Sequence, residues 1–138
     1  MTSTKNINAM VFTQIKETCL YVHDLIKTKE FYGEKLGLEL YSFVNNSHVF
    51  FRVGSSMLLC FLNNTIRKQN SLPPQFATGQ IHFAFEAGHE DYENCKATII
   101  TKGIIIEHEH IWKNNVKSFY FRDPDHHLVE VVEPALWE

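Results

Sequence analysis

The feature of this sequence that most constrains its fold is an order of predicted elements that occurs twice. In the first copy, residues 15–22 alternate as a β-strand does, helical spacing follows from an N-cap at Asp24, and Gly37 ends the helix. Three more strand-like runs come next, separated by turn residues, at 38–44, 48–53 and 57–62. The order strand, helix and three strands defines a βαβββ module.

The same order returns after a polar stretch that contains two adjacent prolines. Residues 80–86 alternate like a strand, a weaker helical face ends at Gly103, and strand-like runs follow at 104–111, 116–122 and 128–132. Glu17 lies 20 residues before the helix-ending glycine of the first copy, and His82 lies 21 residues before that of the second (37 − 17 and 103 − 82). This matching register indicates an internal duplication, with two unrelated β-rich halves as the alternative.

We therefore predict an α+β fold in which residues 1–138 form a single domain. Module one spans 13–63, module two spans 80–133, and a polar linker at 64–79 joins them. In each module a four-stranded sheet carries a helix on its outer face, and the other face remains open. Because sheets of this width must bury both faces, the modules have to pair within one chain or between two chains.

The composition excludes several classes of protein. The net charge is −3 and no run of Lys or Arg exceeds two residues, so the chain lacks the basic stripe that binds nucleic acid or an anionic membrane surface. No apolar run approaches the roughly 20 residues that cross a bilayer, and the N-terminus has no signal-peptide core, so we expect a cytoplasmic location. Three cysteines without CxxC spacing argue against a disulfide framework and against a structural zinc site.

Three residues stand out as candidate metal ligands because of the strand faces they occupy. Period-two alternation places Glu17 and His82 opposite the apolar side chains that belong under the helices, and Glu130 lies between two valines. An unpaired carboxylate among apolar residues is costly, and a divalent cation removes that cost. One imidazole and two carboxylates suit Fe(II), Mn(II), Ni(II) or Zn(II), with open positions for a substrate oxygen or water. The alternatives are a core histidine for His82 and a carboxylate paired with Lys or Arg for Glu130.

Several short segments carry a further signal: Tyr21-Val22-His23-Asp24-Leu25, Phe31-Tyr32, Leu36-Gly37-Leu38, Phe119-Tyr120-Phe121-Arg122-Asp123-Pro124-Asp125 and Leu128-Val129-Glu130. Together they resemble the vicinal oxygen chelate superfamily, which includes glyoxalase I, fosfomycin-resistance transferases, extradiol dioxygenases and bleomycin-binding proteins. The resemblance runs from about Ile15 to Trp137. It implies curved mixed sheets that enclose a cavity, a site often built between two subunits of a homodimer, and metal ligands at Glu17, His82 and Glu130.

The chain departs from the family pattern at three positions. Glu17 stands where the family usually has His. Leu59, which cannot bind a metal, matches the fourth ligand of glyoxalase I, so the three-ligand members are favoured. His126 stands where the last hairpin turn usually carries Gly, and His is one of the few other residues that tolerates a positive φ.

Further site residues follow from the strand faces. Cys19 and Tyr21 share the face of Glu17, and we assign them with Arg122 to substrate binding, Arg122 as the partner of an anionic group. The Tyr120 hydroxyl could donate to an oxyanion, and Glu17 could leave the metal to act as a base. Ordinary strand packing and a surface charge are the alternatives for Tyr120 and Arg122.

Other histidines have simpler interpretations. His108 and His110 share one face of a predicted strand and could bind Zn, but such an alternation is more often a solvated strand face. His126 and His127 lie in a predicted turn, where we expect both to be exposed.

These observations favour a metal-dependent enzyme of the superfamily, one that binds a small substrate through two vicinal oxygens on one divalent metal ion. The alternative is a protein of the bleomycin-resistance type, which binds and sequesters a small molecule without catalysis.

Overall fold

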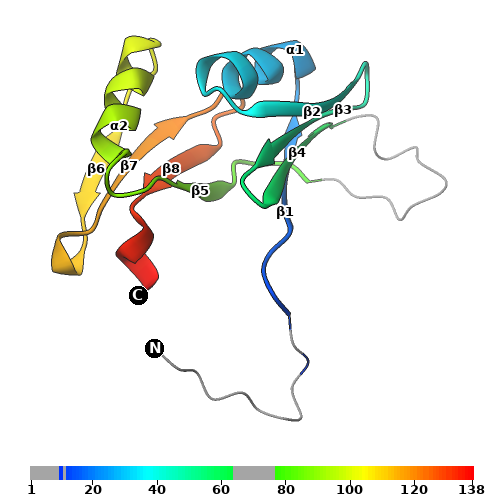
Figure 1. Ribbon diagram of the computed structural model, residues 1–138. Coiled ribbons are helices and arrows are strands. Elements are labelled where there is room, and N and C mark those ends of the chain that lie inside the picture. Colours follow the sequence, from blue (N-terminus) through cyan, green and yellow to red (C-terminus); the bar gives the residue numbers. More distant parts are fainter. Residues whose placement is uncertain (1–9, 11, 64–76) are drawn as a thin grey trace.

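The computed structural model describes residues 10, 12–63 and 77–138, which form two four-stranded mixed sheets and few helices (Figure 1). The strand orders are β1-β4-β3-β2 and β5-β8-β7-β6, so each half of the chain contributes one sheet. The first strand of each half pairs in parallel with the last, and the other pairings are antiparallel. This confirms the predicted α+β fold of two βαβββ modules; most of the predicted linker lies outside the described residues.

The first helical segment begins and ends where the sequence predicts. The side chain of Asp24 accepts a hydrogen bond from the Lys27 amide and caps α1 (Leu25–Lys29). The helix then widens into the π-helix η1 (Glu30–Lys35), which the sequence did not indicate. Gly37 follows with φ +75°, a conformation that glycine adopts without a steric penalty. In module two, α2 (Tyr92–Thr101) ends in the same way before Gly103.

The first sheet consists of β1 (Glu17–Val22), β2 (Glu39–Val44), β3 (His48–Val53) and β4 (Ser56–Leu62). On β1 the alternation is as predicted, because Leu20 and Val22 are buried in the main core. Cys19 and Tyr21 lie on the opposite face, where they pack against side chains of β3 and β4. We call this second surface the open face of module one.

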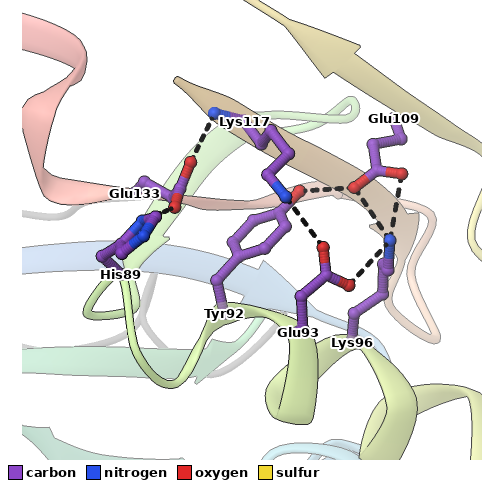
Figure 2. A network of polar contacts seen from close by, with 7 residues as sticks. All are labelled: His89, Tyr92, Glu93, Lys96, Glu109, Lys117 and Glu133. Atoms are coloured by element: carbon purple, nitrogen blue, oxygen red, sulfur yellow. Dashed lines mark hydrogen bonds and ion pairs between the residues drawn. The ribbon is translucent and has the colours of Figure 1, made fainter. Parts of the chain in front are cut away.

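The second sheet consists of β5 (His82–Glu86), β6 (His108–Ile111), β7 (Lys117–Arg122) and β8 (Leu128–Val132). The strand β6 is shorter than predicted, because residues 104–107 do not form a strand; their apolar pattern reflects burial of Ile104 in the core. One row of paired residues crosses the open face of module two, from Ala84 through Glu130 and Tyr120 to His108. On the other face, α2 is tied to β6 and β7 by a polar network (Figure 2).

The two modules share one hydrophobic core and are joined by buried polar contacts near the last hairpin. The Tyr32 hydroxyl donates to the Asp123 carboxylate over 2.7 Å. His127 is buried, which contradicts the expected exposure: its Nδ1 accepts from the Ile81 amide, and its Nε2 donates to the carbonyl of Tyr21. His126 has φ +64°, as its position in the turn predicts. Within the described residues, no helix is long and apolar enough to cross a membrane.

Candidate functional site

His82 and Glu130 meet on the open face of module two. The strands β5 and β8 are parallel neighbours, and His82 Nε2 lies 3.1 Å from Glu130 Oε1. The imidazole is about half exposed, whereas the carboxylate side chain is only 7% exposed. The structure therefore brings together two of the three predicted ligands within one chain.

The hydrogen bonds of His82 orient its lone pair toward the carboxylate. Nδ1 lies 3.0 Å from the carbonyl oxygen of Leu128, which can only accept, so Nδ1 carries a proton. In the neutral ring, Nε2 then presents a lone pair to an oxygen that is also an acceptor. This contact is satisfied only if a proton or a metal ion lies between the two atoms. A backbone carbonyl that fixes the far ring nitrogen is a usual feature of metal-binding histidines.

The second carboxylate oxygen of Glu130 also indicates a cation site. Oε2 is buried and has no hydrogen-bond partner within the described part of the chain. A buried acceptor without a partner is unfavourable by about 1–3 kcal/mol, more for a charged group. Two ligand atoms bound to one ion at about 2.1–2.2 Å and a right angle are about 3.0 Å apart, close to the separation of Nε2 and Oε1. The geometry and the donor types fit a divalent cation.

Tyr120 lies next to this pair and is held by a chain of hydrogen bonds that starts at Trp112, the residue after β6. The Trp112 indole, which can only donate, donates to Ser118 Oγ over 3.0 Å. Ser118 Oγ in turn donates to the Tyr120 hydroxyl over 3.4 Å. The hydroxyl proton of Tyr120 is thus left for Glu130, whose hydrogen bond contributes to the pKa of the phenol, or for a bound substrate. Burial raises the pKa of Tyr120, and the charge of Glu130 adds to that, so the phenol remains protonated. No sequence pattern indicated a role for Ser118 or Trp112.

Arg122 is occupied by this chain's own groups. Its Nε and Nη2 donate to Glu107, and its Nη1 donates to the carbonyl of His126. The ion pair is partly exposed, so an anionic substrate group would compete with a carboxylate already in place. This arrangement does not favour the predicted role of Arg122 in substrate binding.

The third predicted ligand, Glu17, lies elsewhere. It begins β1 in the other sheet, and its side chain is exposed. The described residues contain no group of three or more His, Cys, Asp or Glu side chains that could hold a metal ion, so one chain does not bring Glu17 to His82 and Glu130. Their convergence stays a prediction that requires a second chain.

The open face of module one is apolar and aromatic. Cys19 and Tyr21 pack there with Leu59 and Phe61, while Cys60 points into the core. The strand β4 therefore places Leu59 and Phe61 on the face of Glu17 and the Cys60 thiol on the core face. Burial raises the pKa of Cys19, and the charge of Glu17 adds to it, so the thiol stays protonated.

This face also carries a titratable residue, His48, that was not predicted from the sequence. His48 stacks on Phe50 with a centroid separation of 3.9 Å. The Ser42 hydroxyl lies within hydrogen-bond distance of its Nε2, and the Ser47 hydroxyl within hydrogen-bond distance of its Nδ1. Burial lowers the pKa of His48, so its imidazole is neutral at neutral pH. The only sequence signal was its alternation with Phe50 along β3.

Two duplicated βαβββ modules, with an imidazole and a buried carboxylate facing one another on an open sheet face, define a class of small α+β proteins built around one site. Residues 14–131 match the model of the Glyoxalase/Bleomycin resistance protein/Dioxygenase superfamily. The chain belongs to this superfamily, which confirms the resemblance that its sequence segments carry.

Individual relatives agree with this assignment. The glutathione transferase FosA of Serratia marcescens is 33% identical over 115 residues, which cover 81% of this chain and 74% of that relative. The crystal structure of lactoylglutathione lyase from Agrobacterium tumefaciens has a TM-score of 0.85 and 36% identity, over 91% of this chain and 96% of that one. A glyoxalase/dioxygenase from Nostoc punctiforme, with a TM-score of 0.66 and 19% identity over 93% of this chain and 98% of that one, shows the same fold.

Proposed function

We propose that this protein is a metal-dependent enzyme that acts on a small substrate through two vicinal oxygens. The observation that carries the proposal is the pair formed by His82 Nε2 and Glu130 Oε1, 3.1 Å apart, with a second Glu130 oxygen that is buried and unpartnered within the described residues. A divalent cation held there would polarise the substrate oxygens and stabilise the anion that forms. Fe(II), Mn(II), Ni(II) and Zn(II) all suit the donor set.

The residues around this pair have distinct roles in the proposal. Tyr120, oriented through Ser118, donates its hydroxyl proton to the developing anion. Glu17 completes the ligand set from the open face of module one in a second copy of the chain, so the working form is a homodimer with two equivalent sites. Cys19 and Tyr21 come with Glu17 and line the cavity between the two open faces.

Two observations guide the choice of reaction. The names of two of the three relatives described above contain glutathione, so glutathione is the first co-substrate to test. The family resemblance assigns Leu59 to the position of a fourth protein ligand, which favours transfer of glutathione to a small electrophile over isomerisation of a glutathione hemithioacetal.

Complementation between inactive chains tests the shared site. After loading with Mn²⁺, the Glu17→Ala and His82→Ala proteins should each retain little of this metal. When the two chains are co-expressed, the mixed dimer contains one site with all three ligands, and a statistical mixture should recover about a quarter of the wild-type metal content. Metal content is read by elemental analysis after gel filtration. A mixture that binds no more metal than either parent refutes a site shared between chains.

A second candidate function is binding and sequestration of a small molecule without catalysis. The aromatic open face of module one, with Tyr21, Phe50 and Phe61, is the observation that favours it. Stoichiometric transition metal in the purified protein would favour the enzyme, because sequestration by an aromatic face needs no Lewis acid.

A further inference from the structure

A second group of imidazoles lies on the edge strand β6, apart from the pair of His82 and Glu130. His108 and His110 are two residues apart on β6, and both are exposed. Their ring centroids are 5.8 Å apart, with an interplanar angle of 36°. The intervening Glu109 points to the other face of the sheet, where it accepts hydrogen bonds from Tyr92 and Lys96 (Figure 2).

We propose that His108 and His110 form a bidentate site for Cu²⁺, Ni²⁺ or Zn²⁺, in addition to the site at His82. Imidazole–metal bonds of about 2.0–2.1 Å place the centroids of two rings on one ion about 4.5–5.3 Å apart when the angle at the metal is about 90–110°. The observed separation of 5.8 Å exceeds this by about half an ångström. Small side-chain rotations close that gap, because both rings are exposed and free to adjust.

The donor set decides which ions bind. The nearest carboxylates are committed elsewhere, Glu109 to Tyr92 and Lys96 and Glu107 to Arg122. The site therefore offers two imidazole nitrogens, and within the described residues no third His, Cys, Asp or Glu side chain joins them, so water completes the coordination. Nitrogen ligands favour the late divalent metals, whereas Mg²⁺ and Mn²⁺ prefer oxygen. The pair of His82 and Glu130 includes a carboxylate, so it accepts Mn²⁺ as well as the later metals.

The two sites are neighbours on one face but are separate. The ring of Tyr120 lies between them, 6.0 Å from the ring of His82 and 5.9 Å from the ring of His108. His110 lies further out along β6 and packs against Trp112, with ring centroids 4.4 Å apart. Trp112 is thus an intrinsic fluorescent reporter for an ion bound to His110.

The experiment uses the full-length chain with Trp137→Phe, which leaves Trp112 as its only tryptophan. After treatment with a chelator and dialysis into a non-coordinating buffer, Cu²⁺ should quench the emission in a saturable titration, and Mn²⁺ should not. His108→Gln and His110→Gln should each weaken the apparent affinity by at least about tenfold, because the chelating second ring is lost. His89→Gln alters an exposed histidine that contacts Glu133 and not β6, so it should leave the titration unchanged.

Two results would overturn the proposal: quenching that survives both the His108 and the His110 substitutions, or quenching that disappears when His82→Ala is added to the Trp137→Phe chain. The second would mean that the ion binds at the pair of His82 and Glu130. Persistence of quenching in the His82→Ala chain supports the proposal even if that pair proves to bind no metal. Circular dichroism of each variant shows whether the protein is still folded, so that a loss of quenching can be assigned to the loss of the site.

Discussion

Replacement of Glu130 by glutamine tests whether this chain keeps a buried carboxylate at the expense of its own stability. The Glu130 side chain is 7% exposed, Oε2 has no hydrogen-bond partner within the described residues, and Oε1 lies 3.1 Å from His82 Nε2. Glutamine has the same shape, carries no charge, and can donate its amide hydrogen to His82 Nε2. At pH 8, above the ordinary titration range of histidine, the metal-free Glu130→Gln protein should be more stable than the wild type by about 1–2 kcal/mol.

Bound metal should make the wild type more stable than the Glu130→Gln protein. With Mn²⁺ at about 100 times its dissociation constant, the wild type gains about 2.7 kcal/mol of unfolding free energy. For a domain of this size that gain raises Tm by roughly 10 °C. Glu130→Gln removes an anionic ligand, so we expect Mn²⁺ to raise the Tm of the variant by less than about a quarter of that value. Mn²⁺ is the ion of choice, because the proposed site at His108 and His110 lacks oxygen ligands.

Urea titrations and thermal scans, each with a chelator and with Mn²⁺, measure both effects. Glu133→Gln is the matched control: Glu133 is equally buried, but it accepts from the Lys117 amide and contacts His89 Nδ1, so its replacement should destabilise the protein in both conditions. A metal-free Glu130→Gln protein that is less stable than the wild type by more than about 1 kcal/mol would contradict the argument. Equal stabilisation of variant and wild type by Mn²⁺ would contradict it as well.

Three further predictions follow from other parts of the structure. Tyr32→Phe removes a buried bond to the Asp123 carboxylate and should destabilise the protein by about 1.5–3 kcal/mol in urea titrations, whereas the exposed Tyr41→Phe should have no effect. Burial raises the pKa of Asp123, and the hydrogen bond from Tyr32 lowers it. The loss of unfolding free energy in Tyr32→Phe should therefore become smaller as the pH falls and Asp123 takes up a proton. Because Leu59 cannot bind a metal, the metal-loaded protein should isomerise a glutathione hemithioacetal weakly or not at all in a direct spectrophotometric assay. Glu17→Ala should lower metal content without loss of unfolding free energy, because the side chain is exposed.

The sequence predicted the strand faces well, because they depend on alternation alone. The strands β3 and β8 have the predicted bounds, and the helix-facing positions of β1 and β5 lie in or against the main core. The helix ends could also be predicted from local sequence, because Gly37 and Gly103 adopt the positive φ that glycine allows. The pair of His82 and Glu130 follows from the same alternation, combined with the parallel pairing of β5 and β8.

Features that depend on contacts between distant segments could not be predicted in this way. His127 is adjacent to exposed turn residues in the sequence, yet it is buried because the Ile81 amide and the Tyr21 carbonyl from two other strands meet its ring. The orientation of Tyr120 depends on Trp112 and Ser118, whose hydrogen bond exists only once β6 and β7 pair. No local pattern distinguishes these residues from ordinary strand positions.

The contrast between Glu130 and Glu17 bears on how the proposed site would work. His82 and Glu130 are already positioned within one chain, one by the carbonyl of Leu128 and the other by burial. Glu17 is exposed and belongs to the other sheet, so its predicted convergence with them would require a second chain. A carboxylate that is held loosely can leave the metal and accept a proton more readily than one that is buried. If the proposed dimer forms, Glu130 is therefore suited to a permanent ligand and Glu17 to the exchangeable ligand that acts as a base.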